Sequence, residues 1–188
     1  MQERLLTTQS DVVFTFSIEM FDDAVDREFC RPPDQTLLAL ADDERVGGLV
    51  VADSFRSYIA SVARHRPLRL VEPVTVRSRT VVRARPHRLR KIESTQLGTV
   101  EQAYQRYGVL LGRALARARG EQQPRPESAT LVTYHPFAAA FCDAPWISKV
   151  VYLGRDDWAT GEGVRPWWDL FKEAYRRIEE RGATIFAV

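Results

Sequence analysis

The sequence predicts an α/β protein with an open, mostly parallel sheet and helices on both faces. Three observations predict this fold class. Apolar runs of strand length alternate along the chain with segments of helical periodicity, which is the pattern of β-α-β units. Several runs are continuously apolar, as strands buried on both faces are. One run, residues 150–153, ends abruptly in a glycine and three charged residues, which is typical of a parallel strand that delivers polar groups to a ligand crevice.

Length and composition fit one domain, residues 1–188, with its own core. Hydrophobic residues make up 45% and charged residues 28% of the chain, as in ordinary globular proteins. Residues 1–10 lack the apolar centre of a signal peptide, and no apolar run approaches the roughly 18 residues that span a bilayer. We therefore expect a cytoplasmic protein, with a peripheral contact at the inner face of the membrane left open. Cys30 and Cys142 have no metal-ligand spacing, so we expect two buried thiols and no disulfide.

In the first half of the chain, two strands are predicted at residues 11–17 and 46–53. Arg31-Pro32-Pro33-Asp34 opens a helix between them, with proline at a position where its missing N–H costs nothing. Ser54 is expected to cap a further helix. The apolar face of that helix would consist of Phe55, Tyr58, Ile59 and Val62, which recur at helical spacing.

The middle of the chain is rich in arginine. Residues 68–71 and 80–86 are further strand candidates, and the arginines of the second alternate as on a half-exposed strand. Glu72 is the one acid between Arg64 and Lys91. The arginines between those two positions are Arg66, Arg69, Arg77, Arg79, Arg83, Arg85, Arg88 and Arg90. Two interpretations carry equal weight: a patch for a phosphate-bearing partner, or a solvated surface whose arginine content reflects a GC-rich genome.

The second half of the chain has clearer signals. A long amphipathic helix is predicted over residues 99–120, followed by a surface loop over 121–128. The remaining elements are a strand over 130–134, a short helix containing Phe137 and Phe141, a strand over 149–153, a Gly-rich loop over 160–163, a helix over 166–181 and a strand over 184–188. This alternation predicts a Rossmann-like three-layer fold. Because termini normally lie outside the sheet, we expect one domain of a longer protein.

Polar side chains follow the predicted strands at their carboxyl ends, where open α/β sheets bind ligands. Because the strands over 130–134 and 149–153 are expected to be neighbours, the candidate catalytic residues are the polar groups that follow them, His135, Asp156 and Asp157. Asp53 follows the second strand at the same edge. The candidate substrate-binding residues are Ser17, Glu19, Arg31, Tyr134, Arg155 and Trp158.

Each candidate also has a structural alternative. His135 could bind a phosphate or act as an acid–base group near neutral pH, or it could cap the helix begun by Pro136. Asp156 and Asp157 could bind sugar hydroxyls or serve as a base, or they could cap the following turn. Trp158 could stack on a sugar ring, or it could pack in the core beside the neighbouring tryptophans.

Missing motifs argue against several enzyme classes. No G-x-x-x-x-G-K-[ST] occurs and no G-x-G-x-x-G follows the first strand, which argues against a P-loop enzyme and a Rossmann dehydrogenase. No G-x-S-x-G elbow occurs, which argues against an α/β-hydrolase. His65, His87 and His135 lie far apart in the sequence, and no H-E-x-x-H or Cys pair occurs, so we predict neither a metal site nor a cofactor.

Several short segments resemble the N-terminal half of GT-B glycosyltransferases, in particular bacterial group 1 (family 4-like) enzymes that build cell-surface polysaccharides and teichuronic acids. These segments are Arg31-Pro32-Pro33-Asp34-Gln35, Tyr134-His135-Pro136, Asp156-Asp157-Trp158, the helix rich in Glu and Arg over 173–181, and the strand over 183–188. In layout the resemblance covers the whole chain. The Gly-rich loop that many members carry after the first strand is absent, and Ser17-Ile18-Glu19-Met20-Phe21 stands in its place.

The resemblance implies an acceptor-binding domain whose missing C-terminal partner domain holds the nucleotide-sugar donor. The acceptor would be a cell-surface glycan or a lipid-linked molecule, and His135 would face the donor phosphates across the cleft. The alternative is a non-catalytic, flavodoxin-like binding or regulatory domain that uses the arginine-rich stretch for an anionic partner. An anionic membrane surface ranks above nucleic acid there, because the arginines alternate with apolar residues rather than with stacking aromatics.

Overall fold

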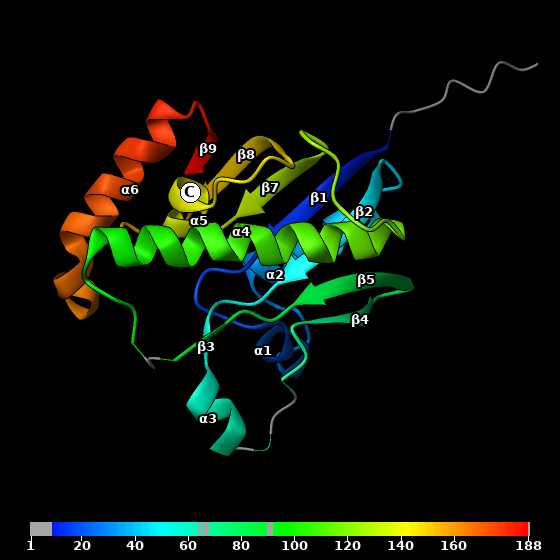
Figure 1. Ribbon diagram of the computed structural model, residues 1–188, viewed down its shortest axis with the longest axis horizontal. Helices are drawn as coiled ribbons and strands as arrows, with labels where there is room; N and C mark the ends of the chain where they lie inside the picture. Colours follow the sequence, from blue (N-terminus) through cyan, green and yellow to red (C-terminus); the bar gives the residue numbers. More distant parts are fainter. Residues whose placement is uncertain (1–8, 64, 66–67, 90–91, 188) are drawn as a thin grey trace, which may run out of the picture.

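The structure, a computed structural model, describes residues 9–63, 65, 68–89 and 92–187, and it confirms the predicted three-layer α/β arrangement (Figure 1). The described residues form a sheet of seven strands in the order β4-β5-β2-β1-β7-β8-β9. These strands are β1 (Ser10–Thr15), β2 (Val46–Ala52), β4 (Val71–Val76), β5 (Arg79–Ala84), β7 (Ala129–Thr133), β8 (Ile147–Gly154) and β9 (Thr184–Ala187). Neighbouring strands run parallel, except that β4 is antiparallel to β5.

The chain winds outward from the centre of the sheet twice. It begins at β1 and moves through β2 to β5 on one side, and it then returns to add β7, β8 and β9 on the other side. This is the doubly wound order of Rossmann-like folds, in which ligands bind where the strand order reverses. The reversal lies here between β1 and β7, which pair directly and end at the same edge of the sheet.

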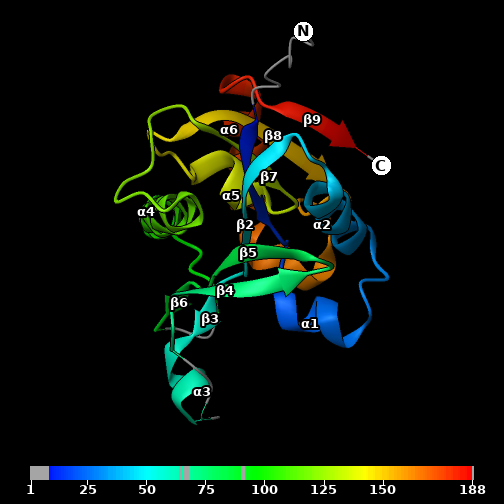
Figure 2. The same ribbon diagram turned by 90° about the vertical axis from the view of Figure 1, so that its right-hand side faces the viewer.

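Helices cover both faces of the sheet (Figures 1 and 2). On one face lie α1 (Phe21–Asp26) and α2 (Pro32–Asp42), and on the other lie α4 (Leu97–Arg119), α5 (Pro136–Phe141) and α6 (Trp168–Glu180). Val13 of β1 packs in the core under α4, whereas its neighbour Phe14 packs in the core under α2. Both side chains are fully buried, and this two-sided burial explains why residues 12–14 at the centre of the strand are all apolar.

The remaining elements lie outside the main sheet. They are β3 (Arg56–Ser57), α3 (Tyr58–Ala63), β6 (His87–Arg88) and the 3₁₀ helix η1 (Glu162–Trp167), and β3 pairs with β6. Both views of the ribbon show α3 standing away from the body of the molecule (Figures 1 and 2). The Gly-rich loop predicted over 160–163 therefore runs into a 3₁₀ turn before α6 begins.

The long helix α4 matches its prediction closely. Its buried face includes Val100, Tyr104, Tyr107, Leu111, Ala114 and Leu115, which are the periodic positions of the sequence. Gly120 follows it with a φ of 68°, a left-handed conformation that glycine adopts without strain and that ends the helix.

The helix predicted from Ser54 is wrong in its start and in its orientation. The structure places residues 56–57 in β3, so the helix begins only at Tyr58. The physical reason is Arg56, whose backbone N–H donates to the carbonyl of Pro86 at 3.0 Å and whose guanidinium enters a buried ion-pair network. The predicted apolar face, Tyr58, Ile59 and Val62, consequently faces solvent instead of the core.

The arginine-rich stretch is neither a continuous basic patch nor a fully solvated surface. Arg83 and Arg85 are buried in β5 and just after it, with exposed fractions of 1% and 9%, because each has an acidic partner inside the protein. Arg79 donates to the carbonyls of Val46 and Gly47, both at 2.6 Å. The strand predicted over 80–86 therefore exists, but its arginines point into the structure rather than into solvent.

Two smaller predictions are also corrected. The strand expected over 68–71 instead begins at Val71 and forms a hairpin with β5. Cys142 is buried as expected, but Cys30 is exposed. The last strand lies at the edge of the sheet, so Ile185 and Phe186 are about half exposed even though the segment is apolar.

Helix α4 packs closely against the loop before β8. Substitutions at two glycines of α4 should therefore have opposite effects on the stability of the protein. A Cβ on Gly112 would lie 2.9 Å from the ring of Trp146, whose Nε1 is held by a hydrogen bond to the carbonyl of Gly108. We expect Gly112→Val to lower the free energy of unfolding by about 1–3 kcal/mol. Gly98→Ala, which meets open space, should raise it by up to about 1 kcal/mol. Urea denaturation measures both changes, and equal stabilities would contradict the packing argument.

Candidate functional site

A cavity of about 360 Å³ opens at the carboxyl edge of the sheet, beside the reversal between β1 and β7. Loops that follow β1, β2, β6, β7 and β8 contribute to it, together with α4, η1 and α6. Three predicted site residues from three different strand ends meet here: Ser17, His135 and Trp158. The cavity is therefore at the position where a Rossmann-like sheet is expected to bind its ligand.

Aromatic rings form a large part of the cavity wall. His135 and Trp158 lie nearly parallel, with ring centroids 6.2 Å apart and an interplanar angle of 25°. Tyr104 lies 5.5 Å from His135, and Phe171 lies 5.4 Å from Trp158, measured between ring centroids. Such walls offer flat apolar faces on which a ring can stack.

A few polar groups interrupt these aromatic walls. Ser17 and Ser54 line the cavity, and the Ser54 hydroxyl donates to the carbonyl of Ile18 at 3.0 Å. Arg88 and Glu93 form an ion pair at 2.5 Å, and the Arg88 guanidinium also lies 5.9 Å from the centroid of Phe55. Among the described residues that line the cavity, Arg88 is the only cation, and its charge is already balanced by Glu93.

His135 has a defined protonation state in this cavity. Its Nδ1 accepts the backbone N–H of Phe137 at 3.1 Å, so His135 caps α5, which is the structural alternative considered for it. Burial, and to a lesser extent the charge of Arg88, lower the pKa of His135 to about 3. The imidazole is therefore neutral near pH 7, and the proton resides on Nε2, which lies 3.4 Å from the hydroxyl of Tyr104. In this state the ring can donate a hydrogen bond to a ligand, and the predicted catalytic role stays a prediction.

Asp156 and Asp157 do not face His135. They line a separate hollow of about 600 Å³ between β8, β9 and α6, together with Arg155. The Asp157 carboxylate accepts the backbone N–H of Ala159 at 3.0 Å, so it caps the turn after β8. The strands that carry them are neighbours as predicted, but the turn directs these carboxylates toward β9 and away from the cavity.

Glu19, Arg31 and Tyr134 lie together on the face of the sheet covered by α2. Glu19 forms an ion pair with Arg31, and Arg27 bridges Glu19 to the buried carboxylate of Asp34. The hydroxyl of Tyr134 lies 2.8 Å from that of Thr36 on α2. These three residues are therefore occupied by contacts with α2 and its N-terminus, whereas the next residue in sequence after Tyr134 faces the cavity.

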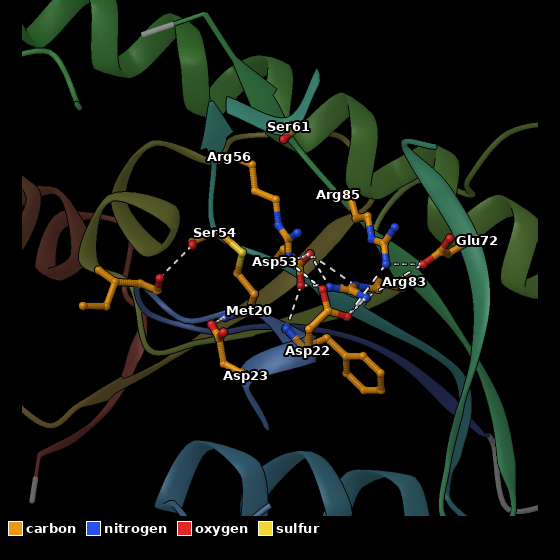
Figure 3. A network of polar contacts seen from close by, with 12 residues as sticks. Met20, Asp22, Asp23, Asp53, Ser54, Arg56, Ser61, Glu72, Arg83 and Arg85 are labelled. Atoms are coloured by element: carbon orange, nitrogen blue, oxygen red, sulfur yellow. Dashed lines mark hydrogen bonds and ion pairs between the residues drawn. The ribbon is translucent and has the colours of Figure 1, made fainter. Parts of the chain in front are cut away.

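A buried ion-pair network lies next to the cavity at the ends of β2 and β5 (Figure 3). Asp53 is fully buried and binds Arg83 through Nε and Nη2, with the shortest contact at 2.7 Å. Asp22 of α1 accepts from Arg83 at 2.5 Å and from Arg56 at 2.9 Å. Arg85 is paired with Glu72 at 2.7 Å. Figure 3 shows Met20 and Ser54, two residues that line the cavity, beside this cluster.

The ion-pair network occupies the carboxylate of Asp53, the residue that follows β2. In dinucleotide-binding Rossmann folds, an acid at this position holds a ribose hydroxyl. Here the Asp53 carboxylate is occupied by Arg83 and by the backbone N–H of Phe21 at 2.8 Å. The hydrogen bond from Arg83 holds the pKa of Asp22 well below its usual value. Asp53 therefore positions α1 and the strand ends, and its oxygens are taken up within the protein.

Several residues that line the cavity are not among the site residues predicted from the sequence. Phe55, Tyr104, Phe137 and Phe171 lie at periodic apolar positions, which indicate core packing. The structure brings them to the cavity from separate elements: Phe55 lies between β2 and β3, Tyr104 on α4, Phe137 on α5 and Phe171 on α6. Their sequence pattern does not distinguish them from other core residues.

The fold defines the chain as a Rossmann-like α/β protein, with a cavity at the topological switch point of its sheet. No known family model, no curated protein and no solved structure matches the chain. Within the described part of the chain, no helix has both the length and the apolar composition needed to cross a membrane. The same residues contain no group of three or more His, Cys, Asp or Glu side chains placed to hold a metal ion.

Breaking the buried ion-pair network should be costly. We expect Asp53→Asn to lower the free energy of unfolding by about 3 kcal/mol, because Arg83 then keeps only Asp22 at 2.5 Å and the more distant Glu72 at 3.8 Å as anionic partners. Adding Arg83→Met should recover part of that loss, since it removes the uncompensated charge. Glu180→Gln, which breaks an exposed pair with Arg176, should leave the denaturation midpoint unchanged. A midpoint for Asp53→Asn equal to that of the control would contradict this account.

The lowered pKa of His135 predicts a specific pH dependence of stability. As the pH falls, His135 takes up a proton near pH 6.5 in the unfolded chain but only near pH 3 in the folded protein. The stability that the neutral, buried imidazole contributes is therefore fully present above pH 6.5 and is lost as the pH falls. Between pH 7 and pH 5 the loss should be about 1–2 kcal/mol. His135→Asn keeps a capping oxygen but does not titrate. Between pH 7 and pH 5 its free energy of unfolding should therefore fall by about 1–2 kcal/mol less than that of the unsubstituted protein. Parallel pH profiles of the two proteins in urea denaturation would rule this out.

Proposed function

We propose that the cavity beside His135 and Trp158 binds a small, ring-containing molecule. The observation that carries this proposal is the set of near-parallel and tilted aromatic rings around a cavity at the switch point of the sheet. Its volume of about 360 Å³ is enough for a ligand of one or two rings. Aromatic rings in the lining favour stacking, as in sites that bind sugars or aromatic groups.

The polar groups of the cavity favour a neutral, hydroxylated ligand over a phosphate. Hydroxyls of Ser17 and Tyr104 and the Nε2–H of His135 can each share a hydrogen bond with a ligand hydroxyl. The carboxylate of Glu93 can accept from such a hydroxyl, as carboxylates do. The loop after β1 contains no run of glycines to cradle a phosphate, and the one described cation of the lining is paired.

In functional terms, the cavity fits the acceptor site of a glycosyltransferase whose nucleotide-sugar site lies on a second domain. The resemblance of the Tyr134-His135-Pro136 and Asp156-Asp157-Trp158 segments to GT-B enzymes supports this proposal, and so does the doubly wound sheet. In such an enzyme the protein contributes mainly positioning and stabilisation of charge. His135 would then orient the acceptor as a hydrogen-bond donor, and the acceptor would be a glycan or a lipid-linked glycoside.

A second candidate function is a non-catalytic, flavodoxin-like binding domain. The observation that favours it is the separation of the titratable groups: Asp156 and Asp157 line another hollow, and the Nδ1 of His135 caps α5. Under this proposal the same cavity binds its ligand, and the protein catalyses no group transfer, either alone or together with a second domain.

Ligand binding can be followed through the two tryptophans of the cavity, Trp158 and Trp167. We expect phenyl glycosides to change the intrinsic fluorescence of the protein in a saturable way. Trp158→Ala should weaken that binding about tenfold, because one stacking face is lost. Trp168→Ala is the matched control, since the Trp168 ring donates to the carbonyl of Gly161 and does not line the cavity.

Two results would count against these proposals. Equal affinities of the two tryptophan variants, or no binding by any glycoside of the panel, would contradict the ligand class. The transferase proposal further expects that residues 1–188 alone bind glycosides but transfer no sugar from a panel of nucleotide-sugars, because half a cleft cannot hold both substrates in line. Robust transfer by residues 1–188 would contradict the two-domain form of the proposal.

A further inference from the structure

The segment that contains α3 differs in its surface from the rest of the molecule. We call residues 57–70 the arm; the structure describes 57–63, 65 and 68–70 of it. The arm leaves the body directly after Ser54, Phe55 and Arg56, and both views show its helix standing away from the sheet (Figures 1 and 2).

The helix of the arm has its apolar side outward. Ile59 is 65% exposed, Val62 is 49% exposed and Tyr58 is 44% exposed, and their spacing puts all three on one side of α3. The polar residue of the same helix, Ser61, is buried and donates to the carbonyl of Ser57 at 3.0 Å. A helix that packed its apolar side on its own protein would show the opposite pattern.

The charge of the arm has one sign. Residues 57–71 contain Arg64, Arg66 and Arg69 and no Asp or Glu, and Arg69 is exposed in the described part of the arm. The next acid in the sequence, Glu72, is paired with the buried Arg85 at 2.7 Å. Leu68 and Leu70, on either side of Arg69, are also partly exposed. In the sequence of the arm, basic and apolar residues are therefore interleaved without an acidic residue among them.

We propose that the arm docks on an anionic membrane surface. Exposed aliphatic side chains on a short helix, flanked by arginines, are the composition of segments that lie in the headgroup region of a bilayer. Tyr58 adds a ring with a polar tip, which suits the same region. Nucleic acid fits the arm less well, because its exposed side chains are mainly aliphatic and offer no series of stacking rings. Since Ser54 and Phe55 line the cavity, docking would hold the cavity beside the lipid surface.

Vesicle flotation tests this proposal directly. The full chain should float with vesicles of phosphatidylcholine and phosphatidylglycerol at low salt, should be released at high salt, and should not float with phosphatidylcholine alone. Ile59→Glu should weaken binding about tenfold, because it removes an inserted side chain and adds a negative charge. Val109→Glu is the matched control: Val109 is 56% exposed on α4, so the change in charge and apolarity is the same at another surface. Arg69→Gln should weaken binding about fivefold.

Val62→Glu serves as a second variant in case Ile59→Glu unfolds, and thermal melting identifies that case. The proposal is overturned if anionic vesicles do not bind the protein, or if a folded Ile59→Glu or Val62→Glu variant binds them as well as the Val109→Glu control does. It is also overturned if light scattering shows that the arm is instead covered by a second copy of the chain, or if duplex DNA binds the arm and anionic vesicles do not.

Discussion

The buried ion pair between Arg83 and Asp53 is the interaction on which the carboxyl edge of the sheet depends. It ties the end of β2 to β5, and the N–H of Phe21 on the same carboxylate fixes where α1 begins. The network also takes in Arg56, which leads the chain out of the sheet toward α3. Such a pair adds little net stability, because desolvation offsets the attraction, but arrangements that leave one charge unpaired are costly. The network therefore restricts how the loops beside the cavity can be arranged.

The centre of the fold could be predicted from the sequence because its signals are local. Strands buried on both faces have a continuously apolar centre, as residues 12–14 do, and the periodicity of α4 together with Gly120 defines a long helix and its end. The placement of Ser17, His135 and Trp158 at one cavity follows from the same level of reasoning, since parallel strands deliver the residues that follow them to one edge.

The rest of the site depends on contacts between distant residues, which periodicity does not encode. Arg83 resembles a half-exposed strand residue until its partners are known, and these lie 61 and 30 residues away at Asp22 and Asp53. Tyr104 resembles an ordinary core residue, although it contributes its ring and its hydroxyl to the cavity. Asp157 follows the correct strand, but the turn that it caps directs it to a different hollow. In each case a tertiary contact decides the direction of a side chain.

The two edges of the sheet are chemically different. On one edge, β4 runs antiparallel to β5 and carries Pro73, which has no N–H to offer to a further strand, and the charge of Glu72 lies beside it. On the other edge, β9 presents a regular parallel strand with Ile185 and Phe186 half exposed. The two edges therefore differ in how they can pair with another strand. The β4 edge ends the hydrogen-bonded ladder, whereas the β9 edge can be extended by an added strand.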